Sequence, residues 1–403
     1  MTTTEHSYAT TPQLSEALKK YQNGFALIGI IFLALLVGGY FIVSPVQFFR
    51  SYLVGFWICF GAGSGCLVLL MVQYLTGGAW GVMLRRPLEA GAKTLYVTWA
   101  GMIPLLLGAH QLYWWTTAAG QADKRIQAKS LYLNFPFLCI RAVIYTVVFV
   151  GLTYLLTKWS ALEDETKSIE YSKKLEAISG PGLVLFVILM TLFGVDFVMT
   201  LEPHWFSTIY GFMTVVGQAL TALCLTVAAL LLMAKFAPMD HALTSKHRHD
   251  LGKLMLAFTM LWAYLHFGQL LITWSANLPD EVIWYIKRWN GGWGWVAIIL
   301  LVFHFFVPFA LLLSQNNKKK ADIFLKIAIF IVVMRIVDVI WLIEPNFTDV
   351  KNVQFNFSWM DVASPVGFLG LWLALFFWNL PQQSLLPLGA PDLQKALNHG
   401  RHH

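Results

Sequence analysis

Residues 322–345 read DIFLKIAIFIVVMRIVDVIWLIEP. This stretch is long and apolar enough to cross a membrane, because a membrane helix needs about 20 mostly apolar residues. It also carries Arg335 and Asp338 within the apolar run. Residues three apart share one face of a helix, so we expect these two side chains to pair. Ionisable groups inside a membrane are costly and usually functional. The same stretch therefore indicates both a fold and a candidate site.

The end of this stretch has a counterpart earlier in the chain. Val337-Asp338 is followed by five residues and then by Glu344-Pro345. Val195-Asp196 is followed by five residues and then by Glu202-Pro203. Four predicted spans separate the two copies, which would then run in the same direction. The pattern predicts a parallel repeat rather than an inverted one.

We predict an all-α integral membrane protein with ten transmembrane helices, arranged as two parallel-repeat four-helix bundles plus two peripheral helices. The apolar runs are residues 25–43, 51–75, 95–115, 134–157, 181–201, 208–234, 252–275, 294–314, 322–343 and 362–380. Within the second run, Gly61 and Gly65 form a GxxxG pair that favours close helix packing. The predicted organisation is a cytoplasmic N-terminal segment (1–22), peripheral helix 1 (23–50), bundle one (51–203), bundle two (204–345), an outer loop with helix 10 (346–380) and a cytoplasmic tail (381–403).

The composition agrees with a membrane protein. The chain is 58% hydrophobic and 12% charged, whereas soluble domains carry about 25% charged residues. With an even number of spans, most of the 28 lysines and arginines fall on the side that holds both termini. Cytoplasmic loops are enriched in these residues. We therefore expect a multi-pass protein of the bacterial inner membrane with both termini in the cytoplasm.

The cysteines and histidines do not predict a cofactor site in this chain. All four cysteines lie in apolar runs, without a CxxC or CxxCH pattern, so we expect no iron–sulfur cluster and no covalently attached haem. Haem b would need two facing histidines at one depth, and the intramembrane histidines differ in depth on a simple count. No spacing of His, Asp and Cys suggests a metal site.

The repeat places one arginine and one aspartate in each bundle, Arg141 with Asp196 and Arg335 with Asp338. The carboxylates could relay protons while the arginines tune their pKa values, or each pair could simply hold helices together. The cytoplasmic half of the spans carries fewer ionisable residues. The predicted proton path consists of Arg141, Asp196, Glu202, His266, Arg335, Asp338 and Glu344, with Glu202 and Glu344 as outer exits.

Two long segments resemble a known family. The segment from Asp196 to Gly211, DFVMTLEPHWFSTIYG, is similar to the D-W-x-M-S-L-E-P-H-W-[FY]-S-T-[IM]-[FY]-G segment of the NrfD-like (polysulfide-reductase-type) membrane subunits of alternative complex III. The segment from Trp274 to Arg288, WSANLPDEVIWYIKR, is similar to the family's W-x-[AG]-N-L-P-x-E-x-x-W-[FY]-x-x-R. The chain length looks most like the ActF subunit. By motif position, Asp196, His204, Glu281 and Arg288 carry over.

The resemblance implies a membrane subunit of a quinol:cytochrome c or quinol:electron-acceptor oxidoreductase, a respiratory or photosynthetic electron-transfer complex. This chain would contribute a transmembrane proton path and dock the redox subunits, without redox chemistry of its own. Menaquinol or ubiquinol would be oxidised in the complex, and the iron–sulfur clusters and c-type haems would lie in partner subunits. The implied partners are a paralogous NrfD-like quinol-binding subunit, an iron–sulfur subunit, multihaem and monohaem cytochrome c subunits, small membrane subunits and lipid, but no nucleic acid.

Three alternatives stay open. The chain itself could bind quinol, with His110 near the outer face as the proton acceptor and Arg141 nearby. It could be a stand-alone transporter with parallel repeats. It could also be a structural membrane anchor for a peripheral redox arm.

Overall fold

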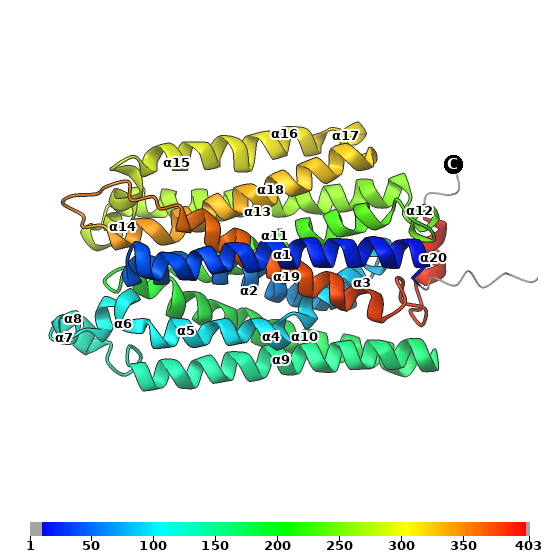
Figure 1. Cartoon of the computed structure of the whole chain (residues 1–403), viewed down its shortest axis with the longest axis horizontal. Coiled ribbons are helices and arrows are strands. Elements are labelled where there is room, and N and C mark those ends of the chain that lie inside the picture. The colour runs from blue at the N-terminus through cyan, green and yellow to red at the C-terminus, as the bar shows by residue number, and fades with distance from the viewer. Residues whose placement is uncertain (1–9, 400–403) are drawn as a thin grey trace, which may run out of the picture.

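The computed structural model describes residues 10–399. The described chain is helical and has no strand, and its long helices run side by side in one elongated bundle (Figure 1). Eight helical segments are long and apolar enough to cross a membrane. They are α1 (Pro12–Ile42), α2 (Pro45–Thr76), α9 (Phe135–Thr166), α10 (Ile169–Phe197, continued by η3, Met199–Leu201), α11 (Tyr210–Met233), α13 (Ser245–Ala276), the segment Trp293–Leu313 and α19 (Met360–Asn379, continued by η6, Leu380–Gln382).

Two of the ten expected spans are not among these eight segments. The run 322–343 forms one continuous helix, α18 (Ala321–Ile343), but it carries four charged side chains, those of Asp322, Lys326, Arg335 and Asp338. The run 95–115 is divided into α4 (Leu95–Thr98), η1 (Trp99–Gly101), α5 (Met102–Leu107), α6 (Ala109–Leu112) and η2 (Trp114–Thr116). Pro104 lies within this run and has no N–H to donate to the preceding turn, where the 3₁₀ segment η1 is found.

The apolar segment Trp293–Leu313 consists of α15 (Trp293–Ile299), the π-helix η4 (Leu300–Phe306) and α16 (Val307–Leu313). The remaining helices are short and mostly lie at the two ends of the bundle. They are α3 (Ala79–Lys93), α7 (Ala118–Gln121), α8 (Lys124–Ala128), α12 (Met239–Ala242), α14 (Pro279–Trp289), α17 (Gln315–Lys319), η5 (Glu344–Phe347) and α20 (Leu393–Asn398).

Helix starts follow local sequence signals. Ser44 caps α2 through its hydroxyl, which accepts from the Gln47 N–H at 3.1 Å, and Pro45 follows as the first helical residue. Asn134 caps α9 in the same way, with its Oδ1 2.9 Å from the Phe137 N–H. Such caps satisfy backbone N–H groups that have no partner in the first turn. Proline fits at the first position because its missing N–H would be unpaired there.

Helices α2 and α11 form the centre of the molecule and approach each other closely at Gly65. A Cβ atom at this glycine would lie 2.2 Å from the Gln218 carbonyl oxygen and 2.8 Å from Ala222 Cβ. Ser64 Oγ also donates to Gln218 Oε1 at 2.9 Å across the same contact. Small residues permit such close packing in membrane proteins, and here they join helices from the two expected bundles.

Helices α1 and α19, the expected peripheral helices, pack against each other. They approach closely at Gly29 and Gly370, where a Cβ atom at Gly370 would lie 2.8 Å from the Gly29 backbone nitrogen. Helix α19 also contacts α2, where Ser364 and Phe368 crowd Gly55. The two helices therefore cover α2 from one side.

Helix α3 forms part of the interior and carries a buried ionic cluster. Arg85 pairs with Glu163 on α9, and both Arg85 and Arg86 pair with Glu89. All four side chains are almost fully buried. Although burial acts to raise it, the Arg86 and Arg85 guanidiniums hold the pKa of the Glu89 carboxyl below its ordinary value. Helix α3 is not among the eight apolar segments, yet it places these charged side chains in the interior of the protein.

Both described chain ends lie at the same end of the bundle (Figure 1). Thr11 Oγ1 donates to the Ala237 carbonyl at 3.1 Å. The C-terminal segment crosses this end, since the Gly389 N–H donates to Asp164 at 2.9 Å and His399 lies 2.8 Å from Asp250. The segment therefore connects the α9–α10 turn to the start of α13.

Candidate functional site

The first candidate site is a buried ion pair between α9 and α10. Arg141 donates through Nε to Asp196 Oδ2 and through Nη2 to Oδ1, both at 2.8 Å. The Tyr145 hydroxyl, one turn further along α9, donates to Asp196 Oδ2 at 2.5 Å. Asp196 is 1% exposed and Arg141 5% exposed. This bidentate geometry is the strongest form of an arginine–carboxylate contact, and it occupies both carboxylate oxygens.

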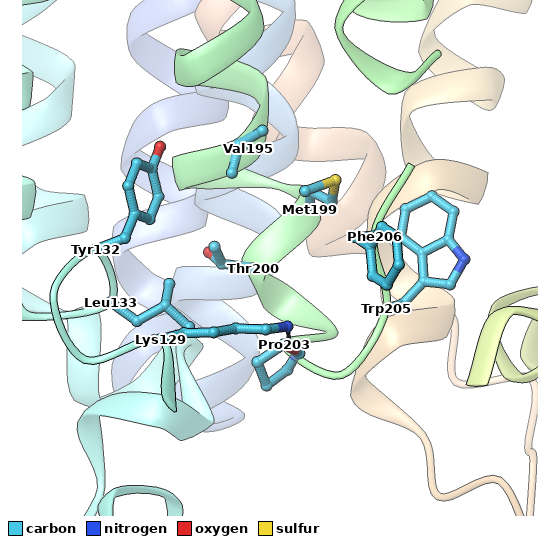
Figure 2. A pocket seen from close by; sticks show the side chains of 9 residues that line it. All are labelled: Lys129, Tyr132, Leu133, Val195, Met199, Thr200, Pro203, Trp205 and Phe206. Carbon is cyan, nitrogen blue, oxygen red and sulfur yellow. Dashed lines mark hydrogen bonds between the residues drawn. The ribbon is translucent and has the colours of Figure 1, made fainter. Parts of the chain in front are cut away.

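A cavity of about 280 Å³ (Figure 2) is lined by Val195, the neighbour of Asp196 in the chain, among other residues. Tyr132 and Thr200 line it. The Tyr132 ring stacks beneath the Arg141 guanidinium at 4.0 Å, and Thr200 Oγ1 donates to the Asp196 carbonyl at 2.7 Å. Lys129 lies across the cavity and donates to the Pro203 carbonyl at 2.9 Å. Two residues of the cavity wall, Tyr132 and Thr200, therefore also contact the residues of the ion pair.

The second candidate site is the Arg335–Asp338 pair on α18, present as the three-residue spacing predicts. Asp338 is 0% exposed and Arg335 3% exposed. Arg335 Nε also donates to Thr221 Oγ1 on α11 at 3.3 Å. The guanidinium lies against Gly217, where a Cβ atom would be 2.4 Å from Nη2. Any side chain at position 217 would therefore require the Arg335 guanidinium to shift.

Asp338 differs from Asp196 in having one oxygen without a hydrogen bond. Trp262 Nε1 donates to Asp338 Oδ2 at 3.1 Å, the oxygen that Arg335 also contacts. Asp338 Oδ1 is buried without a hydrogen-bond partner and faces His266 Nε2 at 3.6 Å. That histidine nitrogen also lacks a partner. A proton on either atom could close this gap as a hydrogen bond.

A cavity of about 470 Å³ adjoins this second site and is lined by Trp262, His266 and Trp341. Each aspartate of the repeated motif thus has a cavity close to it. The second cavity is larger and more apolar, and His266 connects its wall to the free oxygen of Asp338.

The π-helix η4 brings a further histidine to the second site. His304 is fully buried, and neither ring nitrogen has a hydrogen-bond partner. Its ring lies edge-on to the Trp262 indole, with the ring centroids 4.1 Å apart, and the His266 ring contacts the same indole with a centroid distance of 4.4 Å. π-Helical turns occur frequently at functional sites. Trp262 is therefore the common neighbour of two histidines and Asp338.

The two glutamates of the motif have different surroundings. Glu202 pairs with Lys287 of α14. Glu344 is 3% exposed, and its Oε1 has no hydrogen-bond partner. Burial and the nearby Asp361 carboxylate raise the pKa of Glu344 well above its ordinary value, although Arg50 opposes this. Asp361 itself accepts from Ser51 Oγ at 2.5 Å.

His110 of α6 is separate from these groups. It is exposed, its ring faces Phe135 with centroids 6.3 Å apart, and it lines neither cavity. Arg141, the other expected quinone contact, is engaged with Asp196. His204 lies 3.4 Å from Asp123, and Glu281 lies in the first turn of α14.

Sequence reasoning missed the residues that complete each site: Tyr132, Tyr145, Thr221, Trp262 and Asp361. Tyr145 could have been found four residues after Arg141, on the same helix face. Tyr132 lies in the turn before α9, whereas Thr221, Trp262 and Asp361 lie on other helices, and no local pattern marks these four residues.

No group of three or more His, Cys, Asp or Glu side chains that could hold a metal ion occurs within residues 10–399. The repeated pairs are arginine–carboxylate contacts, and an arginine cannot serve as a metal ligand. No protein-family model matches the chain, and no curated protein matches it.

Proposed function

We propose that this chain is an NrfD-like membrane subunit of an alternative complex III, most like ActF, and that it contributes a transmembrane proton path to a quinol-oxidising complex. The observation that carries the proposal is the carboxylate of Asp338, which is fully buried yet has one oxygen free and facing His266. The similarity of residues 196–211 and 274–288 to the family segments supports it.

The proposed architecture has ten spans. Alongside the eight apolar helices, α18 and the broken segment from α4 to α6 would cross the membrane. Bundle one would hold Arg141–Asp196 and bundle two Arg335–Asp338, related by the parallel repeat. Both termini would face the cytoplasm of a bacterium, and the chain would reside in its inner membrane.

The two aspartates have different roles in this proposal. Asp338 would exchange a proton with His266, because each offers an unpartnered atom across 3.6 Å. Asp196 accepts from two Arg141 nitrogens and from Tyr145, so it would have to release the arginine before it could take up a proton. Glu202 and Glu344 would lie on the outer side of the path, with Glu344 held protonated more readily than an ordinary glutamate.

The partners are proposed on the same basis. Menaquinol or ubiquinol would be oxidised in the paralogous NrfD-like subunit, and electrons would pass to an iron–sulfur subunit and then to c-type haem subunits. This chain would dock those subunits and carry no redox group. The tryptophans of the outer end, Trp114, Trp274, Trp289, Trp295 and Trp359, are exposed and could contact lipid headgroups or a peripheral subunit.

The proposal has two experimental requirements. The chain, purified in mild detergent with an affinity tag, should bring down haem-containing and iron–sulfur subunits. The intact complex in liposomes should then be compared with its Asp338→Asn variant for quinol turnover and for the ratio of protons to electrons.

We expect Asp338→Asn to lower the proton-to-electron ratio, and Asp280→Asn to leave it unchanged. Asp280 is the matched control, because it is 55% exposed and pairs with Arg125 at the surface. Purification without any redox subunit would refute the assignment to the complex. A normal ratio and turnover in a well-folded Asp338→Asn complex would refute the proton path.

A further inference from the structure

The cavity of about 470 Å³ has an apolar, outward-facing wall. Phe267 of α13 is 63% exposed, and Leu301 and Phe306 of η4 are each 52% exposed. Exposed aromatic and aliphatic side chains are stable where they face lipid, so this side of the cavity would open to the hydrocarbon interior. The lining also includes Arg288 of α14 and Trp341, whose buried indole N–H has no hydrogen-bond partner.

Arg288 is a buried cation without a carboxylate partner. It is 1% exposed, and among residues 10–399 it forms no ion pair. Its guanidinium donates to three neutral acceptors, the Trp284 and Leu342 carbonyls and Asn346 Oδ1, and lies 3.4 Å from the centroid of the Trp284 ring. Its Nε–H has no acceptor. The preceding Lys287, in contrast, pairs with Glu202.

The charge on Arg288 persists at neutral pH. Burial lowers the pKa of this guanidinium to about 9, which still leaves it protonated at pH 7. A buried charge is stable only when it is paired or well hydrogen-bonded. Neutral carbonyls satisfy some of its N–H groups but do not compensate the charge, and the one carboxylate that acts on it electrostatically, Glu202, is paired with Lys287. The cavity therefore has no carboxylate paired with Arg288.

We propose that this cavity binds one anionic glycerophospholipid, whose phosphodiester accepts hydrogen bonds from Arg288 and the Trp341 indole and whose acyl chain lies along Phe267, Leu301 and Phe306. Helix α14 lies at the end of the bundle where α13 ends (Figure 1), and tryptophans cluster there. That is the depth at which headgroups meet the hydrocarbon region. The inference requires only that the chain lies in a bilayer, and it does not depend on the respiratory proposal.

Charge and shape both select this ligand. A free phosphate would satisfy Arg288 but would leave the apolar part of the cavity empty. An uncharged lipid such as a diacylglycerol would fill the apolar wall and leave the guanidinium uncompensated. Only a molecule with both parts complements the whole cavity, so binding should require the phosphate and the acyl chains together.

The test uses the full-length protein, purified in detergent and stripped of lipid. Native mass spectrometry would count adducts with phosphatidylglycerol, with diacylglycerol of the same acyl chains, and with inorganic phosphate. We expect one phosphatidylglycerol per chain, and we expect the other two probes not to compete at the same concentration. Arg288→Gln should weaken phosphatidylglycerol binding at least about tenfold, equivalent to about 1.4 kcal/mol.

Two further variants make the result interpretable. Arg125→Gln removes a cation at the same end of the molecule that is 59% exposed and already paired with Asp280, and it should bind the lipid normally. Ala297→Phe places a large ring in the cavity wall and keeps Arg288, and it should also lose binding. If Arg288→Gln does not fold, Ala297→Phe and the competition series decide.

Three outcomes would overturn the proposal. The first is phosphatidylglycerol binding by a folded Arg288→Gln variant as tightly as by the unmodified chain. The second is diacylglycerol binding as tightly as phosphatidylglycerol, which would reduce the site to an acyl-chain groove. The third is displacement of phosphatidylglycerol by a short-chain quinone at lower concentration, which would assign the cavity to a ring-headed ligand.

Discussion

Replacing Asp196 by asparagine tests whether the Arg141–Asp196 contact stabilises the α9–α10 pair. The carboxylate accepts two hydrogen bonds from Arg141 at 2.8 Å and one from Tyr145 at 2.5 Å. A hydrogen bond to a charged group contributes about 1.5–3 kcal/mol, and removing one partner of a buried ion pair costs about 3–5 kcal/mol. We expect Asp196→Asn to lower the free energy of unfolding by about 3–5 kcal/mol.

The assay is reversible unfolding by sodium dodecyl sulfate in mixed micelles, followed by tryptophan fluorescence. Asp196→Asn, Arg141→Gln and the double variant complete a thermodynamic cycle. We expect a coupling energy above about 2 kcal/mol, well beyond the roughly 0.6 kcal/mol that is typical of interhelical hydrogen bonds in membrane proteins. The exposed Arg125–Asp280 pair is the control cycle, expected at about 0.2–1 kcal/mol. Independent, additive losses at Arg141 and Asp196 would refute the reasoning.

Three further results are expected. Gly217→Ala should destabilise the protein by about 1–3 kcal/mol in the same assay, because the new methyl group would overlap the Arg335 guanidinium; a neutral effect would mean that the arginine has room to move. The raised pKa of Glu344 means that its contribution to stability is fully present below its unfolded pKa, about 4.3, and is lost as pH rises through its folded pKa. Glu344→Gln should therefore flatten the dependence of the melting temperature on pH above about 4.3, and an unchanged profile would contradict this. Glu163→Gln should cost about 3–5 kcal/mol by leaving the buried Arg85 with fewer compensating charges, and limited proteolysis should then cut near α3; unaltered protection of α3 would argue against this role.

The apolar runs located the long helices, and at α11 both ends agree within two residues, since residues 208–234 were predicted and Tyr210–Met233 is helical. The larger differences occur where helices continue beyond their apolar stretch. Helix α9 extends from the predicted end at 157 to Thr166, and α10 begins at Ile169 rather than near 181. An apolar run ends where the surroundings change from lipid to water. The helix itself can continue beyond that point, because backbone hydrogen bonds and not apolar side chains define it.

The candidate site was predictable only where the sequence carries local spacing. Arg335 and Asp338 are three residues apart, and that spacing alone predicts their contact. The contact of Trp262 with Asp338 depends on how α13 is rotated about its axis against α18, which hydrophobicity alone does not determine in a helix with apolar residues on every face. The burial of α3 was not predicted for a related reason. Its charged residues are typical of a loop, and their pairing with α9 cannot be inferred from local spacing.

The close contact at Gly65 limits the kinds of motion available to the molecule. Carriers that alternate between two faces tilt one half of the protein against the other, and tilting needs an interface that slides. Here the meeting helices leave no space even for a methyl group, and the Ser64–Gln218 hydrogen bond crosses the same contact. A proton could be transferred between fixed side chains across such an interface. A larger solute would require the two halves to separate, which this contact opposes.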